Sequence, residues 1–239
     1  MPVPIDTYSL RACIAPIFLT ILPLLLAINL WAPKSVSLEV LSGSTIVSIA
    51  LSVLAAQLGR HGKTKEPGLW QSWGGPPTTR FLRHRDTQFN PIRRARCHKN
   101  LEKCIPEIHM PTAQEEIENP LAADQVYEMF TRYLIDRTRD KKRYPLIFKE
   151  NVNYGFLRNL WGLKGVGIFI SGLSLIGSGF YGCLQWVNHK TVAPEALIMG
   201  GLCLLAVLLW IFWVKPDTIR IPAEAYAERL LEFCENMNS

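Results

Sequence analysis

The sequence lacks the short motifs that identify common enzyme families. Its 239 residues contain no GxSxG, HExxH or Walker A sequence, and its serines lie mainly in apolar segments. The acidic run Glu115, Glu116 and Glu118 is typical of the first turn of a helix. We therefore expect a protein that is not an enzyme, with no catalytic residue and no cofactor.

Closely spaced cysteines are also absent. The six cysteines form no CxxC, and most of them lie in apolar segments or in the C-terminal segment. This pattern argues against a secreted disulfide framework and favours free thiols in a reducing compartment. Cys97, His98, Cys104 and His109 lack the close ligand pair of zinc sites, so we expect no metal site.

Charged residues are missing from the middle of four apolar windows, each long enough to span a bilayer, which takes roughly 20 residues. The windows are residues 12–32, 38–58, 165–187 and 195–214. The absence of Asp, Glu, Lys and Arg in mid-span argues against a proton relay or an ion-coupled transporter. The second window follows the first after only a short link, and this argues against a cleaved signal peptide.

The charges that flank the windows predict the topology. Lys and Arg are concentrated at residues 59–65, 158–164 and 215–220, and positive charge marks the cytoplasmic side. We therefore expect a multi-pass membrane protein with both termini in the cytoplasm. The predicted fold is α-helical: two transmembrane hairpins (12–58 and 165–214) flank a cytosolic domain (59–164), with a short N-terminus (1–11) and a tail (215–239).

The predicted cytosolic domain shows few strand signals and several helix signals. Apolar spacing predicts helices over residues 92–105, 121–139 and 146–160, and an amphipathic tail helix after Pro222. Thr112 followed by Glu115 predicts a capping box at the start of a further helix. The domain is therefore expected to be mainly helical.

Small polar residues recur every four positions in the second and third windows, and this spacing places them on one helix face. Small residues allow close packing of membrane helices, and this is one interpretation of the pattern. The other is a weakly polar wall that lines a pore between several subunits. The pore-lining candidates are Ser44, Ser48, Ser52, Ser174 and Ser178.

Basic residues are concentrated after the second window. Residues 59–111 hold eleven Lys or Arg and four Asp or Glu, whereas residues 112–140 hold three and seven. Convergent cations suit phosphate, and flat aromatic rings suit stacked bases. The candidate ligand-binding residues are Arg80, Arg83, Arg85, Arg93, Arg94, Arg96, Trp70, Trp73, Thr78 and Thr79. Two alternatives remain for these basic residues: they could contact the acidic residues 112–140 of a neighbouring subunit, or they could bind anionic lipid.

The segment 67–85 combines two functions in this interpretation. Residues 67–73 are expected to form an interfacial collar around a helix end, because Trp prefers the membrane interface. Residues 74–85 are expected to form a turn at Gly74 and Gly75 that directs threonines and arginines toward an anionic group.

The layout of four apolar windows around a basic insert resembles the transmembrane effectors of bacterial phage-defence operons, of which the Hailong-type effector is nearest. The resemblance covers the layout and the basic run from Arg80 to Lys99, without a motif that matches residue by residue. It implies a homo-oligomeric channel, a cytosolic nucleotide or single-stranded oligonucleotide ligand made by a co-encoded nucleotidyltransferase, and cell death or growth arrest on opening. A membrane-anchored scaffold for a protein partner and a membrane enzyme remain as alternatives.

Overall fold

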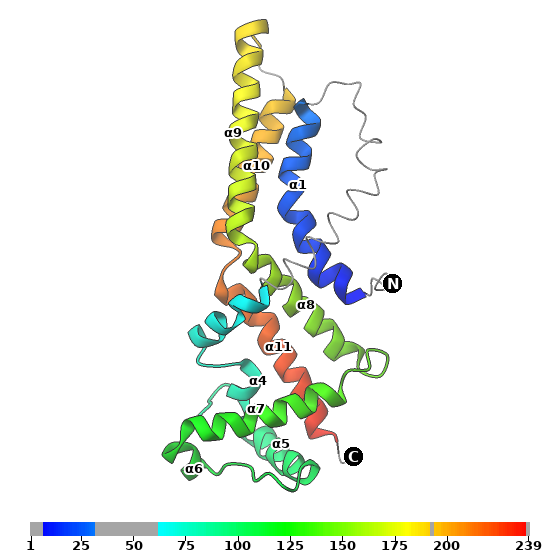
Figure 1. Cartoon of the computed structure of the whole chain (residues 1–239), viewed down its shortest axis with the longest axis vertical. Helices are drawn as coiled ribbons and strands as arrows, with labels where there is room; N and C mark the ends of the chain where they lie inside the picture. The colour runs from blue at the N-terminus through cyan, green and yellow to red at the C-terminus, as the bar shows by residue number, and fades with distance from the viewer. Residues whose placement is uncertain (1–6, 32–61, 192–193, 238–239) are drawn as a thin grey trace. The chain divides into compact units, whose positions relative to one another are not determined.

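The computed structural model describes residues 7–31, 62–191 and 194–237, without side chains at 29–31. Every regular element in these ranges is a helix (Figure 1). The chain divides into two compact units, which we call the apolar unit (Met1–Glu66 and Gly155–Ile219) and the charged unit (Pro67–Tyr154 and Arg220–Ser239). One division falls within the helical residues 62–72, and the other two fall inside α8 (Pro145–Gly162) and α11 (Pro216–Glu235), so both of these helices contribute to both units.

The apolar unit contains three helices that are long and apolar enough to cross a membrane. A π-helical turn, Ser9–Ile14, leads into α1 (Ala15–Trp31), and α9 (Lys164–His189) is followed by α10 (Pro194–Phe212). The bounds of α9 and α10 lie within two residues of the predicted windows 165–187 and 195–214, and those of α1 lie within three residues of the first window, 12–32. The predicted span 38–58 lies outside the described residues.

One end of the apolar unit has its own small core. Ile17 of α1, Leu160 of α8 and Trp210 of α10 are buried together with Leu163 and Val214. Asn159 Nδ2 donates a hydrogen bond of 2.7 Å to the carbonyl oxygen of Ala12. The start of α1, the end of α8 and the end of α10 therefore meet at this end of the unit.

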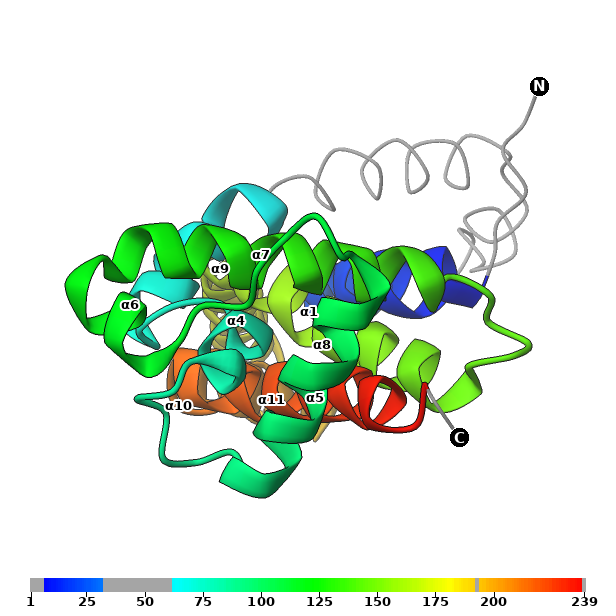
Figure 2. The same cartoon turned by 90° about the horizontal axis from the view of Figure 1, so that it is seen from below.

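Several helices and the first half of α8 pack around one core in the charged unit. Its elements are α4 (Pro77–Leu82), α5 (Pro91–Cys104), α6 (Ala113–Glu118), α7 (Pro120–Arg137) and α11 from Arg220 onward. Figure 2 shows α4 between α7 and α11, with α5 crossing in front of α11. All four supply fully or nearly buried side chains, among them Leu82, Leu101, Phe130 and Leu231.

The helix starts of this unit follow from their capping residues. The side chain of Asn90 accepts bonds from the backbone N–H groups of Ile92 and Arg93, and Pro91 occupies the first helical position, where its missing N–H is not needed. Thr112 and Glu115 form the predicted capping box of α6, and Asn119 caps α7. The predicted boundaries of α5 and α7 are confirmed to within two residues.

The C-terminal helix differs from its prediction. It begins at Pro216, six residues before Pro222, which lies inside the helix. Its apolar stripe, which includes Ala227, Leu230 and Cys234, is fully buried in the core of the charged unit. The tail therefore belongs to the same compact unit as residues 67–154, because burial of this stripe requires α5 and α7 as partners.

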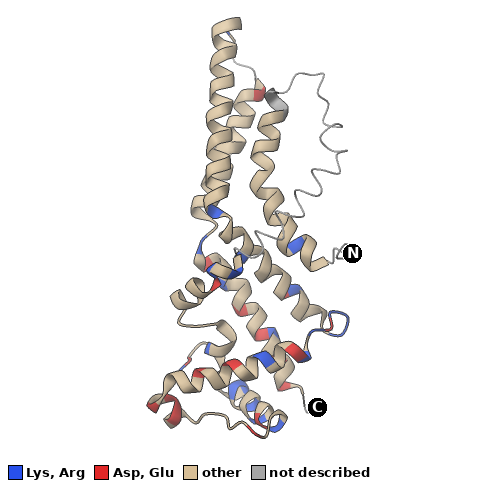
Figure 3. Cartoon of the chain, in the orientation of Figure 1, with Lys and Arg blue, Asp and Glu red and all other residues tan. Residues whose placement is uncertain are grey.

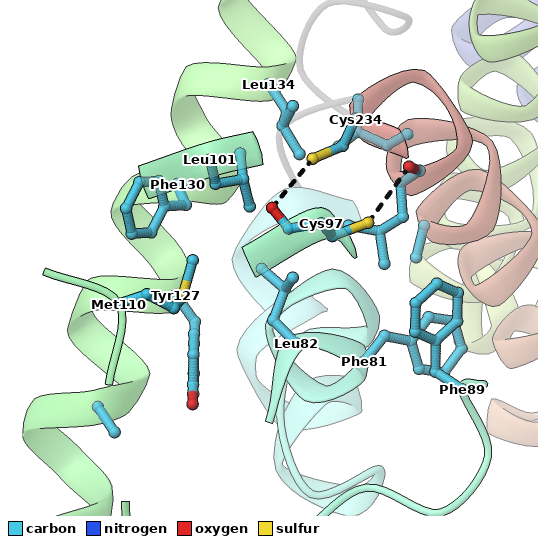
Figure 4. Packing of buried hydrophobic residues seen from close by; sticks show 14 of the residues in the cluster. Phe81, Leu82, Phe89, Cys97, Leu101, Met110, Tyr127, Phe130, Leu134 and Cys234 are labelled. Carbon is cyan, nitrogen blue, oxygen red and sulfur yellow. Dashed lines mark hydrogen bonds between the residues drawn. The ribbon is translucent and has the colours of Figure 1, made fainter. Parts of the chain in front are cut away.

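Cys97 and Cys234 join α5 to α11 inside this core (Figure 4). Cys97 Sγ donates to the carbonyl oxygen of Leu231, and Cys234 Sγ donates to that of Cys97, each over 3.6 Å. The hydrogen bond with the Cys97 thiol, and then burial, raise the pKa of Cys234. Both thiols are fully buried, and Cys234 stays protonated at neutral pH, so they act as packing residues in this structure.

Candidate functional site

Arg80 lies on α4 and is surrounded by acceptors of its own chain. Its Nη1 donates to the carbonyl oxygen of Trp73 over 3.1 Å, and its Nη2 bonds to the side chains of Gln88 and Glu224. Asp86 Oδ2 is 3.5 Å from Nε, and the side chain is 10% exposed. Its charge therefore joins α4 to α11 within the charged unit.

Arg83 follows α4 and makes a two-pronged ion pair with α7. Its Nε and Nη2 lie 2.7 and 2.8 Å from the two carboxylate oxygens of Asp124, and Nη1 donates to the carbonyl oxygen of Gly74. Gly75 has φ of 127°, and a Cβ there would lie 2.7 Å from Arg83 Nη2. The turn therefore provides a carbonyl group, that of Gly74, and space beside Gly75 for the Arg83 guanidinium.

Arg94 and Arg93, on the first turn of α5, are also engaged. Arg94 is buried, and its Nη1 donates to the carbonyl oxygen of Asp86 over 2.7 Å. Arg93 Nε lies 2.6 Å from Glu235 on α11, and its guanidinium stacks on Phe89 at 5.0 Å. These contacts fix the loop before α5 and the end of α11.

Arg85 is the most accessible of the arginines between α4 and α5. Its side chain is 47% exposed, 3.7 Å from Glu116 and 3.8 Å from Asp124. Arg80, Arg83, Arg85 and Arg93 therefore pair with carboxylates of residues 112–140 or of α11 in the same chain, and Arg94 bonds to a backbone carbonyl group. The charged unit as a whole holds 17 Lys or Arg and 15 Asp or Glu, a balance of +2.

The predicted aromatic and hydroxyl contacts are mostly enclosed. Trp73, Thr78 and Thr79 are buried, and Trp70 is half-buried. Gly74 has φ of 80°, so the turn predicted at 74–75 is present. The turn leads directly into α4, which buries Thr78 and Thr79 against the core. These three side chains are therefore placed for packing, not for stacking on an external base.

The outer face of α5 is the exception. Arg96, Lys99 and Lys103 are exposed, and within the part of the chain that the structure describes no ion pair engages them. Their spacing of three and four residues places them in one row, which Ile92, 73% exposed, extends toward the helix start. Figure 3 shows this basic side of α5. We call the three residues the α5 basic row; of them, sequence analysis selected only Arg96.

A buried polar network lies behind the arginines and was not predicted. Glu116 is 2% exposed and accepts bonds from the N–H groups of His84 and Arg85 and from the Tyr127 hydroxyl. His98 lies 2.7 Å from the carbonyl oxygen of Leu82, and its ring packs edge-on against His84. Glu116 resembles an ordinary first-turn carboxylate in sequence, and only its position against α7 distinguishes it from Glu115.

Burial sets the protonation of this network. Desolvation lowers the pKa of His98 to about 4, so its ring is neutral at pH 7. Burial alone raises the pKa of Glu116, but bonds from His84, Tyr127 and Arg85 outweigh it and lower the pKa below the ordinary 4.5. Burial, and then donation to Glu116, raise the pKa of Tyr127. Glu116 is therefore a buried anion whose donors are all supplied by the chain.

The serines of α9 lie in helix packing. Gly167, Ser171, Ser174, Ser178 and Gly182 form its buried stripe. The hydroxyls of Ser174 and Ser178 donate to the carbonyl oxygens four residues earlier, both over 2.9 Å. A Cβ at Gly167 would lie 2.2 Å from the Trp210 ring of α10. The packing interpretation thus describes the α9 stripe in this chain, whereas Ser44, Ser48 and Ser52 lie outside the described residues.

Metal-binding groups do not converge in the described ranges. No set of three or more His, Cys, Asp or Glu residues there could hold a metal ion. Cys97 and His98 turn to different carbonyl groups, those of Leu231 and Leu82.

Three comparisons with known proteins were made for this chain. No family model, no curated protein and no solved structure matches the chain.

Proposed function

We propose that this protein is a membrane-embedded effector whose charged unit binds a polyanionic ligand, a nucleotide or a single-stranded oligonucleotide, on the α5 basic row. The observation that carries the proposal is that Arg96, Lys99 and Lys103 are exposed and form no ion pair within the described ranges, whereas Arg80, Arg83 and Arg94 bond to other groups of the charged unit. Free cations in a row suit successive phosphates.

The spacing of the α5 basic row supports a ligand with more than one phosphate. Side chains three and four residues apart on a helix are neighbours, with Cβ atoms about 5–6 Å apart. Three long, flexible side chains in such a row can contact adjacent phosphates of a chain without reading its bases. The ligand specificity expected from this row alone is therefore low, and its affinity depends strongly on salt.

The membrane part of the proposal rests on the three apolar helices and on the layout that resembles phage-defence effectors. We propose an inner-membrane protein with cytoplasmic termini that assembles as a homo-oligomer and opens a pore when the ligand binds. The hydroxyl stripe of α9 is occupied by packing within the chain, so a pore would be formed by other surfaces of several subunits.

Ligand binding can be tested on the full chain in detergent with a fluorescein-labelled, short single-stranded oligonucleotide. Replacing Arg96, Lys99 and Lys103 together by Glu is expected to abolish the rise in anisotropy. In the wild type, three phosphate contacts predict a slope of log affinity against log salt of about −2. The matched control reverses Arg132 and Arg139, which are equally exposed but paired with Glu128 and Asp136.

The control variant should keep its affinity within about threefold, because its cations are already paired with carboxylates three or four residues away. Equal affinity of the wild type and the α5 triple variant would refute the ligand site. The pore is tested separately by conductance in liposomes with and without the oligonucleotide, and conductance that does not respond to the ligand would leave binding without gating.

A second candidate function, a membrane-anchored scaffold, is favoured by one apolar corner. Ile117 at the end of α6 and Leu121 at the start of α7 are 73% and 77% exposed. A co-encoded protein that docks there should co-purify with the wild type and be lost when both residues are replaced by Ser. In that case the oligonucleotide should not bind and no conductance should appear.

A further inference from the structure

A groove runs along the apolar unit between α1 and α10. It encloses about 260 Å³ and is lined on one side by Leu19, Leu22 and Leu26 of α1, and on the other by Met199, Leu202 and Trp213. Every side chain that lines it is apolar apart from the tryptophan N–H groups. In a bilayer such a groove suits an extended hydrocarbon chain, because it offers contact area without any polar group to satisfy.

The groove ends beside two lysines. Lys164 Nζ donates to the carbonyl oxygens of Val214 and Ile211, over 2.8 and 3.2 Å, and Val214 itself lines the groove. An ammonium group has three N–H donors, so one remains free. Lys215 follows Val214 and is exposed. Lys164 therefore bonds to a residue that lines the groove, and Lys215 is the next residue in the chain after it.

The same end of the unit is strongly positive. The Lys65 ammonium donates to the carbonyl oxygen of Gly162, and Asn159 bonds to Ala12, so the first turns of α1 and α9 and the end of α10 lie together here. Six cations face two carboxylates among the described residues at this end: Arg11, Lys63, Lys65, Arg158, Lys164 and Lys215 against Glu66 and Asp217. Figure 3 shows Lys and Arg in blue near the lower ends of α1 and α9, while most of both helices is tan.

Aromatic residues mark the level of the interface at this end. Trp161 stands next to Lys65, whose ammonium lies 5.8 Å from the ring centre, while Trp210 and Trp213 line the groove. Tryptophan prefers the headgroup level of a bilayer, and lysine near the surface attracts anionic lipid. A second groove, between α9 and α10, adjoins the opposite end, where Lys190 and Glu195 balance each other.

We propose that the α1–α10 groove binds one acyl chain of an anionic phospholipid, with the lipid phosphate held by Lys164 and Lys215. The inference rests on the proposed placement of these helices in a membrane. It does not depend on the α5 basic row or on pore formation. Charge complementarity selects the occupant, because an apolar groove alone would accept any lipid.

Native mass spectrometry of the full chain, released from micelles that contain equal amounts of phosphatidylglycerol and phosphatidylcholine, tests the inference. The wild type should retain phosphatidylglycerol preferentially. Lys215→Gln should lower that preference about fivefold, the effect of about 1 kcal/mol per juxtamembrane lysine. Lys190→Gln at the opposite end is the matched control and should leave the preference unchanged. Equal retention of the two lipids by the wild type would overturn the proposal.

A photo-crosslinking residue in place of Ala206, which lines the groove, identifies what occupies it. A crosslink to phosphatidylglycerol is expected after reconstitution in mixed vesicles. A crosslink to residues 38–58 of the same chain, or to a second copy, would overturn the lipid assignment. Because Lys215→Gln should leave oligonucleotide binding unchanged, failure of this proposal is distinct from failure of the ligand site.

Discussion

The two units bury polar residues by different means. In the charged unit Arg80 and Arg83 are nine-tenths buried and are matched by carboxylates and carbonyl oxygens from other elements. In the apolar unit Ser174 and Ser178 are matched by carbonyl oxygens of their own helix, and Gly167 admits the Trp210 ring. A buried charge pair requires a second element of the fold to supply the opposite charge. A hydroxyl that bonds within its own helix requires only enough space beside the neighbouring helix. Buried polar side chains therefore find their partners on other elements in the charged unit and within the same helix in the apolar unit.

The largest expected effect is the loss of Arg80. Arg80→Met leaves the buried Asp86 without its cation and leaves Glu224 with the half-buried Arg220 alone, and breaking a buried pair typically destabilises by about 3–5 kcal/mol. The measurement is the rate at which a maleimide labels Cys97, in the core of the charged unit, as urea is added to the full chain in detergent. Arg96→Met is the matched control and should change the free energy of unfolding by less than about 0.5 kcal/mol. Equal changes in the free energy of unfolding for the two variants would show that the ion pairs of Arg80 do not stabilise the charged unit.

In the apolar unit the corresponding test adds a methyl group. Gly167→Ala places a Cβ against the Trp210 ring, and overpacking of this kind typically costs about 1–3 kcal/mol. Labelling of Cys203, which is fully buried on α10, should accelerate accordingly. Gly179→Ala, on the same helix with nothing within 4 Å of its Cβ, should leave the labelling rate unchanged. If both variants behave alike, α9 and α10 do not pack through Gly167.

Mild acid should affect the charged unit through His98. Its folded pKa of about 4 lies below the ordinary 6.5, so the unfolded chain takes up the proton first. Stability is therefore full above pH 6.5 and falls as the pH drops toward 4. Between pH 7 and 5.5 the loss should be about 1 kcal/mol, measured by Cys97 labelling. His98→Gln should remove this pH dependence, and an unchanged slope in that variant would assign it to another group.

The smallest expected effect belongs to Ser178. Ser178→Ala removes a hydroxyl whose acceptor is a carbonyl of the same helix, and hydrogen bonds between membrane helices average only about 0.6 kcal/mol. Cys203 labelling should change less than in Gly167→Ala, and any ligand-gated conductance should persist. A loss of conductance with unchanged labelling would instead place Ser178 at a water path.

Much of the helical structure could be predicted from local chemistry. Apolar windows, the Asn90-Pro91 start of α5 and the Thr112–Glu115 capping box act within a few residues, so the sequence shows them directly. The candidate site could be predicted less well, because a basic run has the same appearance whether its charges are free or paired. Arg83 and Asp124 are 41 residues apart, and Arg80 and Glu224 are 144 apart. The sequence around each of these residues contains no signal that predicts its partner.

By itself the sequence determined that this protein is helical, that three described helices can cross a membrane, and where most of the described helices begin. These properties depend on hydrophobicity, length and capping, which act over one or a few helical turns. Only the tertiary structure decided which arginines are free. Packing α11 and α7 against α4 and α5 brings Glu224, Glu235 and Asp124 to Arg80, Arg93 and Arg83, and it leaves the α5 basic row facing outward. Ion pairing acts through space, so the folded positions of distant carboxylates determine which cations stay unpaired among the described residues.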